Sequence, residues 1–165
     1  MHEIEKLALK GVYSISQEHI ISTIVSDQLH QINLANEGPN CNRFALATPV
    51  GNLHDLPIMI AEIICHANRV PTNYLGASHP ADCLGEAVNA LKCKTVVMGV
   101  ISSVQWNYEK NIVKYLQSID KYLNNRVGII LGGGYKIDFP DFENIGNIKF
   151  ISSFEDFDKM LIGLK

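Results

Sequence analysis

The sequence predicts an α/β fold in which a parallel β-sheet is covered by helices on both faces. Short apolar runs alternate with segments of helical periodicity along most of the 165 residues. These runs are nearly continuous, which is typical of strands that are buried on both faces. Because 47% of the residues are apolar and the formal net charge is only −3, we expect a soluble globular chain with one sizeable core.

The N-terminal part of the chain predicts a separate helical segment. Residues 15–32 carry apolar side chains at close to helical spacing, and Glu18 lies near the expected start of this helix. Residues 33–42 have no such periodicity and contain a Gly-Pro-Asn sequence, which is typical of a linker. We therefore expect an N-terminal helical segment over 1–36 and an α/β domain over 37–165.

The α/β part resolves into five strand signals. The strands are expected at residues 43–47, 70–75, 95–100, 127–131 and 148–151. Helices are expected between and after them, at residues 58–67, 80–91, 106–123 and 153–164. Pro80 suits the first turn of its helix because its missing N–H has no partner there. Five such units fit a flavodoxin-like sheet with the strand order 2-1-3-4-5.

One histidine lies where this fold binds ligands. His54 belongs to the loop that follows the first predicted strand. In open α/β sheets, the loops after strands 1, 3 and 4 meet at the carboxyl edge, and ligands bind in the crevice there. An imidazole in that crevice could coordinate a metal ion or a metal-bearing cofactor. The other two loops that meet it are residues 99–105 and 132–135.

Several classes of protein that share this fold are excluded because this chain lacks the residues that they need. The first strand ends in Ala47-Thr48, whereas a phosphoryl receiver needs a carboxylate there. The loop that follows has only Gly51, so it lacks a dinucleotide-binding glycine pattern. There is no run of Lys and Arg, and we expect no direct binding to nucleic acid. Ser102 and Ser103 have no evident base, and no catalytic constellation is visible, so we expect a protein that is not an enzyme.

The composition also gives an expectation of the cellular compartment. The four cysteines form no C-x-x-C pair and are interpreted as reduced thiols. No apolar run reaches the ~18 residues of a membrane span, and the charged N-terminus is unlike a signal peptide. A cytoplasmic location without membrane contact is therefore expected.

Residues 132–134 are three glycines, which could form a tight turn or let the backbone approach a bulky ligand.

Three short segments resemble a known family. Residues 52–57 fall at the place of an acid-x-His-x-x-Gly motif, residues 99–101 at that of Ser-x-Leu, and Gly132-Gly133 at that of a Gly-Gly pair. With these spacings, nearly the whole chain resembles the cobalamin-binding domain of methionine synthase, base-off mutases and light-responsive cobalamin-dependent regulators. Residues 47–51 and 73–76 are similar to the regulator branch.

The N-terminal segment is similar to the same branch. Residues 11–19 resemble the last helix of the four-helix cap that covers the corrin in the regulators, where a Glu-His pair faces the upper ligand. Glu18 and His19 match that pair, whereas Ala8 stands where the family has tryptophan. The resemblance therefore implies a remnant of the cap.

The resemblance implies a set of ligand contacts. In the family, the histidine replaces the dimethylbenzimidazole base on cobalt, the acid accepts a hydrogen bond from the other ring nitrogen, and the displaced nucleotide tail passes the small residues. Carried onto this chain, His54 is the metal ligand, in the His-on, base-off state. The implied cobalamin contacts are Thr48, Asn52, Leu53, His54, Asp55, Gly99, Val100, Ile101, Ser103, Gly132, Gly133, Gly134, Glu18 and His19.

This chain departs from the family pattern at three positions. Asn52 replaces the acid and carries no charge, Pro57 replaces the glycine and stiffens the loop, and Gly99 replaces the serine. Ser103 is a partial substitute for the lost hydroxyl. The cofactor that the resemblance implies is cobalamin in an undetermined form, and these departures leave heme or no cofactor as the alternatives.

The leading functional hypothesis is a cobalamin-binding sensor of the kind that controls transcription and responds to light in the regulators. Because no helix-turn-helix is present, it would act through a protein partner, and the N-terminal helix would favour a homo-oligomer. One alternative is the small cobalamin-carrying subunit of a mutase or methyltransferase. Another is a degenerate domain that serves only as an interaction module.

Overall fold

The structure is a computed structural model that describes residues 20, 23–25, 27–28, 43–103 and 105–164. The chain divides into two compact units, Met1–Asn33 and Leu34–Lys165. In the first unit the described residues are helical, as expected for that part of the sequence. Glu18, His19 and the predicted boundary between residues 36 and 37 lie outside the described residues, so the cap remnant and the domain bounds stay predictions.

The second unit contains a parallel sheet of five strands. The strands are β1 (Phe44–Pro49), β2 (Thr72–His79), β3 (Thr95–Gly99), β4 (Val127–Gly132) and β5 (Ile145–Ile151). Their order in the sheet is β2-β1-β3-β4-β5, and every neighbouring pair is parallel. This confirms the predicted flavodoxin-like fold and its strand order.

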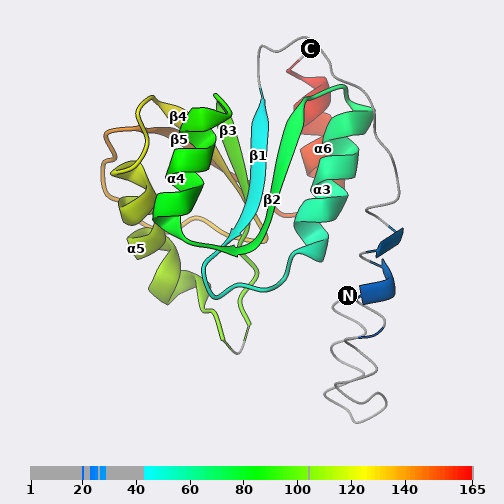
Figure 1. Cartoon of the computed structure of the whole chain (residues 1–165), viewed down its shortest axis with the longest axis horizontal. Coiled ribbons are helices and arrows are strands. Elements are labelled where there is room, and N and C mark those ends of the chain that lie inside the picture. Colours follow the sequence, from blue (N-terminus) through cyan, green and yellow to red (C-terminus); the bar gives the residue numbers. More distant parts are fainter. Residues whose placement is uncertain (1–19, 21–22, 26, 29–42, 104, 165) are drawn as a thin grey trace. The chain divides into compact units, whose positions relative to one another are not determined.

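Helices cover both faces of this sheet (Figure 1). They are α3 (Leu56–Ala67), α4 (Ala81–Ala90), α5 (Tyr108–Asp120) and α6 (Phe154–Ile162). α3 and α6 pack side by side on one face, and α4 and α5 pack on the other. Each face has its own apolar core, with Leu46 and Ile58 in one and Met98 and Leu116 in the other. All six residues of β1 are buried, as expected of a central parallel strand.

Two strands, β2 and β5, extend well beyond the bounds predicted for them. β2 continues to His79 instead of ending at residue 75, because Gly76 and Ser78 adopt positive φ angles (93° and 54°) and absorb two register shifts against β1. β5 begins at Ile145 instead of residue 148. The carboxylate of Asp120, in α5, accepts hydrogen bonds from the N–H groups of residues 143–145 and holds the chain in place to enter the sheet. Such long-range contacts leave no local signal in the sequence.

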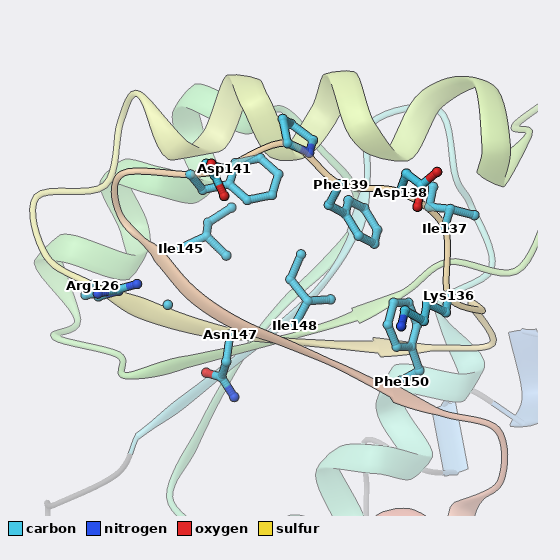
Figure 2. Close-up of a pocket in the computed structure, with 13 residues that line it drawn as sticks. Arg126, Lys136, Ile137, Asp138, Phe139, Asp141, Ile145, Asn147, Ile148 and Phe150 are labelled. Carbon is cyan, nitrogen blue, oxygen red and sulfur yellow. The ribbon is translucent and has the colours of Figure 1, made fainter.

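A segment without a helix connects β4 to β5. We call residues 136–142 the β4–β5 strap; they make no hydrogen bond with the described residues. One end is anchored by the Tyr108 hydroxyl, which donates to the carbonyl of Tyr135 at 2.7 Å, and the other by Asp120. Phe139 stacks on Phe150 of β5, with ring centroids 6.1 Å apart. Figure 2 shows the hollow of about 480 Å³ between the strap and β5.

Within the part of the chain that the structure describes, no helix has the length and apolar character needed to cross a membrane.

Candidate functional site

The loop between β1 and α3 leaves the carboxyl edge of the sheet and is tied to the end of β2. The hydroxyl of Thr48, which is fully buried, accepts a hydrogen bond from the N–H of Ser78 at 2.8 Å and donates one to the carbonyl of Asn52. The N–H of Gly51 donates to the hydroxyl of Ser78 at 3.0 Å. Gly51 has φ of +85°, a conformation that favours glycine. These bonds give the loop a defined backbone.

Asn52 joins this loop to the loop after β3. Its side chain is fully buried, and its amide nitrogen donates to the carbonyls of Gly99 at 3.3 Å and Ile101 at 3.1 Å. Its amide oxygen accepts a hydrogen bond from the backbone N–H of His54 at 3.1 Å. Because an ionised carboxylate has no hydrogen to donate, an aspartate could not make the two bonds to the carbonyls. The structure thus gives a local reason for asparagine at this position.

The imidazole of His54 is half-buried and makes no hydrogen bond with the residues that the structure describes. The side-chain oxygen of Asn52 accepts a hydrogen bond from the backbone N–H of His54 and not from its ring. Among the described residues, no group of three or more His, Cys, Asp or Glu side chains could hold a bare metal ion. One histidine can, however, complete the coordination of a metal that a macrocycle already holds. Within the described residues, the single histidine could thus complete the coordination of a metal that already has other ligands, and it offers too few donors for a bare ion.

The residues next to His54 have different surroundings, since one bonds β2, one begins a helix and one is exposed. The carboxylate of Asp55 accepts a hydrogen bond from the Tyr74 hydroxyl of β2 at 3.2 Å. Burial, and then the charge of Asp55, raises the pKa of Tyr74 above its usual range. Pro57 lies in the first turn of α3, where a proline is well tolerated. Leu53 is 61% exposed, so an apolar side chain stands free beside His54.

Four glycines, Gly99 and Gly132 to Gly134, lie at or beside the positions of the family motifs, and three of them pack closely against side chains of this chain. A Cβ atom on Gly99 would lie 3.0 Å from Cγ2 of Ile58 and 3.3 Å from Cγ2 of Thr48. A Cβ atom on Gly133 would lie 2.6 Å from Cγ1 of Ile101, and Gly133 has φ of +80°. A Cβ atom on Gly134 would lie 2.9 Å from both Cε2 of Tyr108 and Cγ2 of Val100. A Cβ atom on Gly132 would make only an ordinary contact, 3.7 Å from the carbonyl oxygen of Met98. Internal packing and the turn after β4 therefore account for Gly99, Gly133 and Gly134.

The loop after β3 has its own internal bonds. The hydroxyl of Ser103 accepts a hydrogen bond from the N–H of Trp106 at 3.1 Å, and that of Ser102 accepts one from the N–H of Tyr108 at 2.9 Å. Val100 is fully buried, and Ile101 is 38% exposed. The Ser103 hydroxyl thus supports the entry to α5.

The structure brings most of the predicted site residues to one edge. Thr48, Asn52 and His54 lie beside Gly99 and Ile101, and Gly99 pairs with Gly132 in the sheet. Sequence reasoning missed Ser78 and Tyr74, which hold the His54 loop from β2. No sequence signal could have found them, because each bonds a residue far away in the chain.

The similarity of this chain to known proteins is found at the level of the fold. No family model matches the sequence, and no curated protein matches it. One similar solved structure is a novel cobalamin-binding protein from Desulfitobacterium hafniense DCB-2, with 16% identity and a TM-score of 0.46 over 96% of this chain and 66% of that chain. Another is a chain of the methanol:cobalamin methyltransferase complex MtaBC from Methanosarcina barkeri, with 16% identity and a TM-score of 0.58 over 98% and 61%.

This chain therefore spans no more than about two thirds of the length of either matched chain. The similarity to the chain of the Methanosarcina complex is one of fold, which agrees with the five-stranded parallel sheet described above.

Proposed function

We propose that this chain is a cobalamin-binding sensor module in which His54 ligates the cobalt and a protein partner receives the signal. One observation carries the proposal. The His54 imidazole is half-buried at the carboxyl edge, has no hydrogen bond to a described residue, and stands on a backbone that Asn52 holds in place. A ring on a fixed backbone whose nitrogens bond none of the described residues is well prepared to bind a metal.

One further point favours cobalamin among metal-bearing macrocycles. A single histidine suits any metal that already has its other ligands, as a corrin or a porphyrin provides. A solved structure with this fold belongs to a methanol:cobalamin methyltransferase complex, whereas no comparison favours heme. When bound, cobalamin would supply a cobalt centre whose coordination depends on its upper ligand. Asn52 would orient His54 through the main chain, and Leu53 would offer apolar contact at the edge.

The glycine positions favour a second candidate function. The contacts of Ile58 with Gly99 and of Ile101 with Gly133 fill the places where the family pattern leaves room for a nucleotide tail. These residues do not fit a buried tail without moving. A domain that has kept the fold and lost the cofactor, and serves as an interaction module, accounts for that packing directly.

A cobalamin-carrying subunit of a methyltransferase is a third candidate, and the similarity to a chain of the Methanosarcina complex favours it. Such a subunit needs a separate catalytic chain. A sensor and a carrier differ in one respect that can be measured. Illumination or exchange of the upper ligand should change the association of a sensor with itself or its partner, whereas a carrier should keep the same assembly in both states.

The proposal is tested by retention of the corrinoid. The protein is mixed in the dark with adenosyl-, methyl- or hydroxocobalamin, passed through gel filtration and examined by absorption. We expect a retained corrinoid with a shifted spectrum, lost in His54→Ala and kept in His79→Ala. His79 is the matched control because it is half-buried at the end of β2, near the same edge. No retention of any form would sink the proposal and support the interaction module.

A further inference from the structure

We propose that two loops at the amino edge of the sheet form a docking surface for an acidic segment of a protein partner. The loops are residues 91–94, between α4 and β3, and residues 121–126, between α5 and β4. Together they contain four cations and no acidic residue, and we call them the basic loop pair. The inference rests on the proposed function only in taking the partner to be a protein.

Hydrogen bonds hold the two loops side by side. The side-chain amide of Asn89, in the last turn of α4, donates to the carbonyl of Tyr122 at 2.7 Å and accepts from the N–H of Asn124 at 3.0 Å. The carbonyl of Lys94 accepts a hydrogen bond from the N–H of Gly128, in β4, at 3.0 Å. Because β3 and β4 are neighbours in the sheet, the cations of both loops lie on one surface.

These cations carry charge that the described part of the chain does not neutralise. All four are exposed, and none makes an ion pair with the described residues: they are Lys92, Lys94, Lys121 and Arg126. Positive charge stays in excess even if the adjoining Asp120 and the exposed Glu143 are counted, with four cations against two acids. The carboxylate of Asp120 already accepts three backbone N–H groups. The surface therefore has the opposite sign to the formal net charge of −3 and favours an anionic partner.

Two exposed apolar side chains lie among the cations. Tyr122 is 44% exposed and Leu91 is 37% exposed. The backbone of Tyr122 is fixed, because Asn89 bonds its carbonyl and a Cβ atom on Gly85 would lie only 2.5 Å from its Cβ atom. A fixed aromatic ring beside an aliphatic side chain, with charge around both, is typical of protein interfaces. A nucleic acid could stack a base on the ring but would gain little from the leucine, so the surface favours a protein.

The backbone of Lys92 has a conformation in which glycine would be more stable. Lys92 follows α4 with φ of +54°, and the N–H of Cys93 donates to the carbonyl of Val88 at 3.0 Å. Glycine is the usual residue at this point of a helix end, because it has no Cβ atom to strain there. The dipole of α4 favours a cation at this end but does not require a positive φ angle. The stability of the fold therefore does not account for a lysine here, whereas a docking role does.

The test is a titration of a labelled synthetic peptide, composed of Glu and Leu, into the full-length protein without corrinoid, followed by fluorescence anisotropy. We expect saturable binding that weakens as salt is raised. Peptides with Gln in place of Glu, or Ser in place of Leu, should bind ~10-fold more weakly. A single-stranded DNA oligonucleotide of equal charge is titrated in parallel. Because no corrinoid is present, the result does not depend on cobalt ligation by His54, and the two proposals can fail separately.

Lys92→Gly separates docking from folding. It should keep or raise the free energy of unfolding in urea, because glycine suits a φ of +54°, while it weakens binding of the Glu and Leu peptide ~5-fold. Arg69→Gly is the matched control. Arg69 is also an exposed cation after a helix, with φ of +60°, but it precedes β2 and lies outside the basic loop pair. Arg69→Gly should therefore bind the peptide as the original protein does.

Three results would overturn the proposal. The first is no saturable binding of the Glu and Leu peptide, and the second is an equal loss of binding in Lys92→Gly and Arg69→Gly. The third is tighter binding of the oligonucleotide than of the peptide, which would replace the protein partner by a nucleic acid. Undiminished binding of the peptide with Ser in place of Leu would overturn the role given to Tyr122 and Leu91.

Discussion

The side-chain amide of Asn52 donates a hydrogen bond to the main-chain carbonyl of Ile101 at 3.1 Å, across 49 positions of the sequence. It joins the loop after β1 to the loop after β3, the two strands that lie side by side where the strand order reverses. Because the oxygen of the same amide holds the backbone of His54, the placement of His54 depends on this bond.

Replacement of Asn52 by aspartate should therefore destabilise the protein. A carboxylate would face the two carbonyls that now accept hydrogen bonds, and we expect a loss of ~1–3 kcal/mol in the free energy of unfolding near pH 7. Urea unfolding measures this loss. Asn107→Asp is the matched control, since the side chain of Asn107 only accepts a hydrogen bond at the start of α5, which aspartate also does. An equal effect in both variants would contradict the role given to Asn52.

The deficit of Asn52→Asp should also depend on pH. A buried carboxyl beside carbonyls should have a raised pKa in the folded state, because burial disfavours its charge and its protonated form can donate. The full deficit is then present above the folded pKa and shrinks as pH falls through it toward the unfolded value of ~3.9. Unfolding curves at a series of pH values test this sign. A deficit that grows on acidification would contradict it.

Gly99→Ser, which introduces the serine of the family motif, should lower the free energy of unfolding of this chain. A Cβ on Gly99 would lie 3.0 Å from Cγ2 of Ile58, and overpacking of this kind costs about 1–3 kcal/mol. Ile58→Ala removes that methyl group, so the double variant should lose less stability than the sum of the single variants. Gly132→Ala is the control, because its Cβ would meet only the carbonyl of Met98 at 3.7 Å. Strictly additive effects would argue against the contact.

The anchor of the β4–β5 strap can be tested at Asp120. Its carboxylate accepts hydrogen bonds from three successive N–H groups, at 3.0, 2.8 and 2.9 Å. We expect Asp120→Ala to lower the free energy of unfolding by ~1–3 kcal/mol and to speed amide exchange at residues 143–145. Asp141→Ala, in the strap itself, should change neither quantity because Asp141 makes no hydrogen bond or ion pair with the described residues. Protected amides at 143–145 in Asp120→Ala would refute the anchor.

A second pH effect should arise at the start of α6. Hydrogen bonds from the hydroxyl of Ser153, and then from that of Ser152, lower the pKa of Asp156 below its ordinary value. The resulting stabilisation is present above the unfolded pKa of ~3.9 and is lost as pH falls through the folded pKa. Asp156→Asn should therefore show a smaller loss of stability on acidification than the original protein does. Thermal unfolding between neutral and acidic pH measures the difference.

The strand order could be predicted because each strand is a short apolar run and parallel sheets with this alternation have few solutions. The place of His54 followed from the same topology. The role of Asn52 could not be predicted, since its partners at residues 99 and 101 become neighbours only when β1 and β3 pair. The early start of β5 likewise depends on Asp120, which lies in α5.

In the proposed function, a ring nitrogen of His54 binds cobalt. The most direct measurement is an electron paramagnetic resonance spectrum of the protein with cobalt(II) cobalamin, made once with unlabelled histidine and once with ¹⁵N-labelled histidine. We expect the axial nitrogen splitting to change from a triplet to a doublet on labelling, and we expect His54→Ala to lose the labelled signal. A triplet that persists in labelled protein would show that the cofactor's own base is the ligand, and His54 would then not bind cobalt.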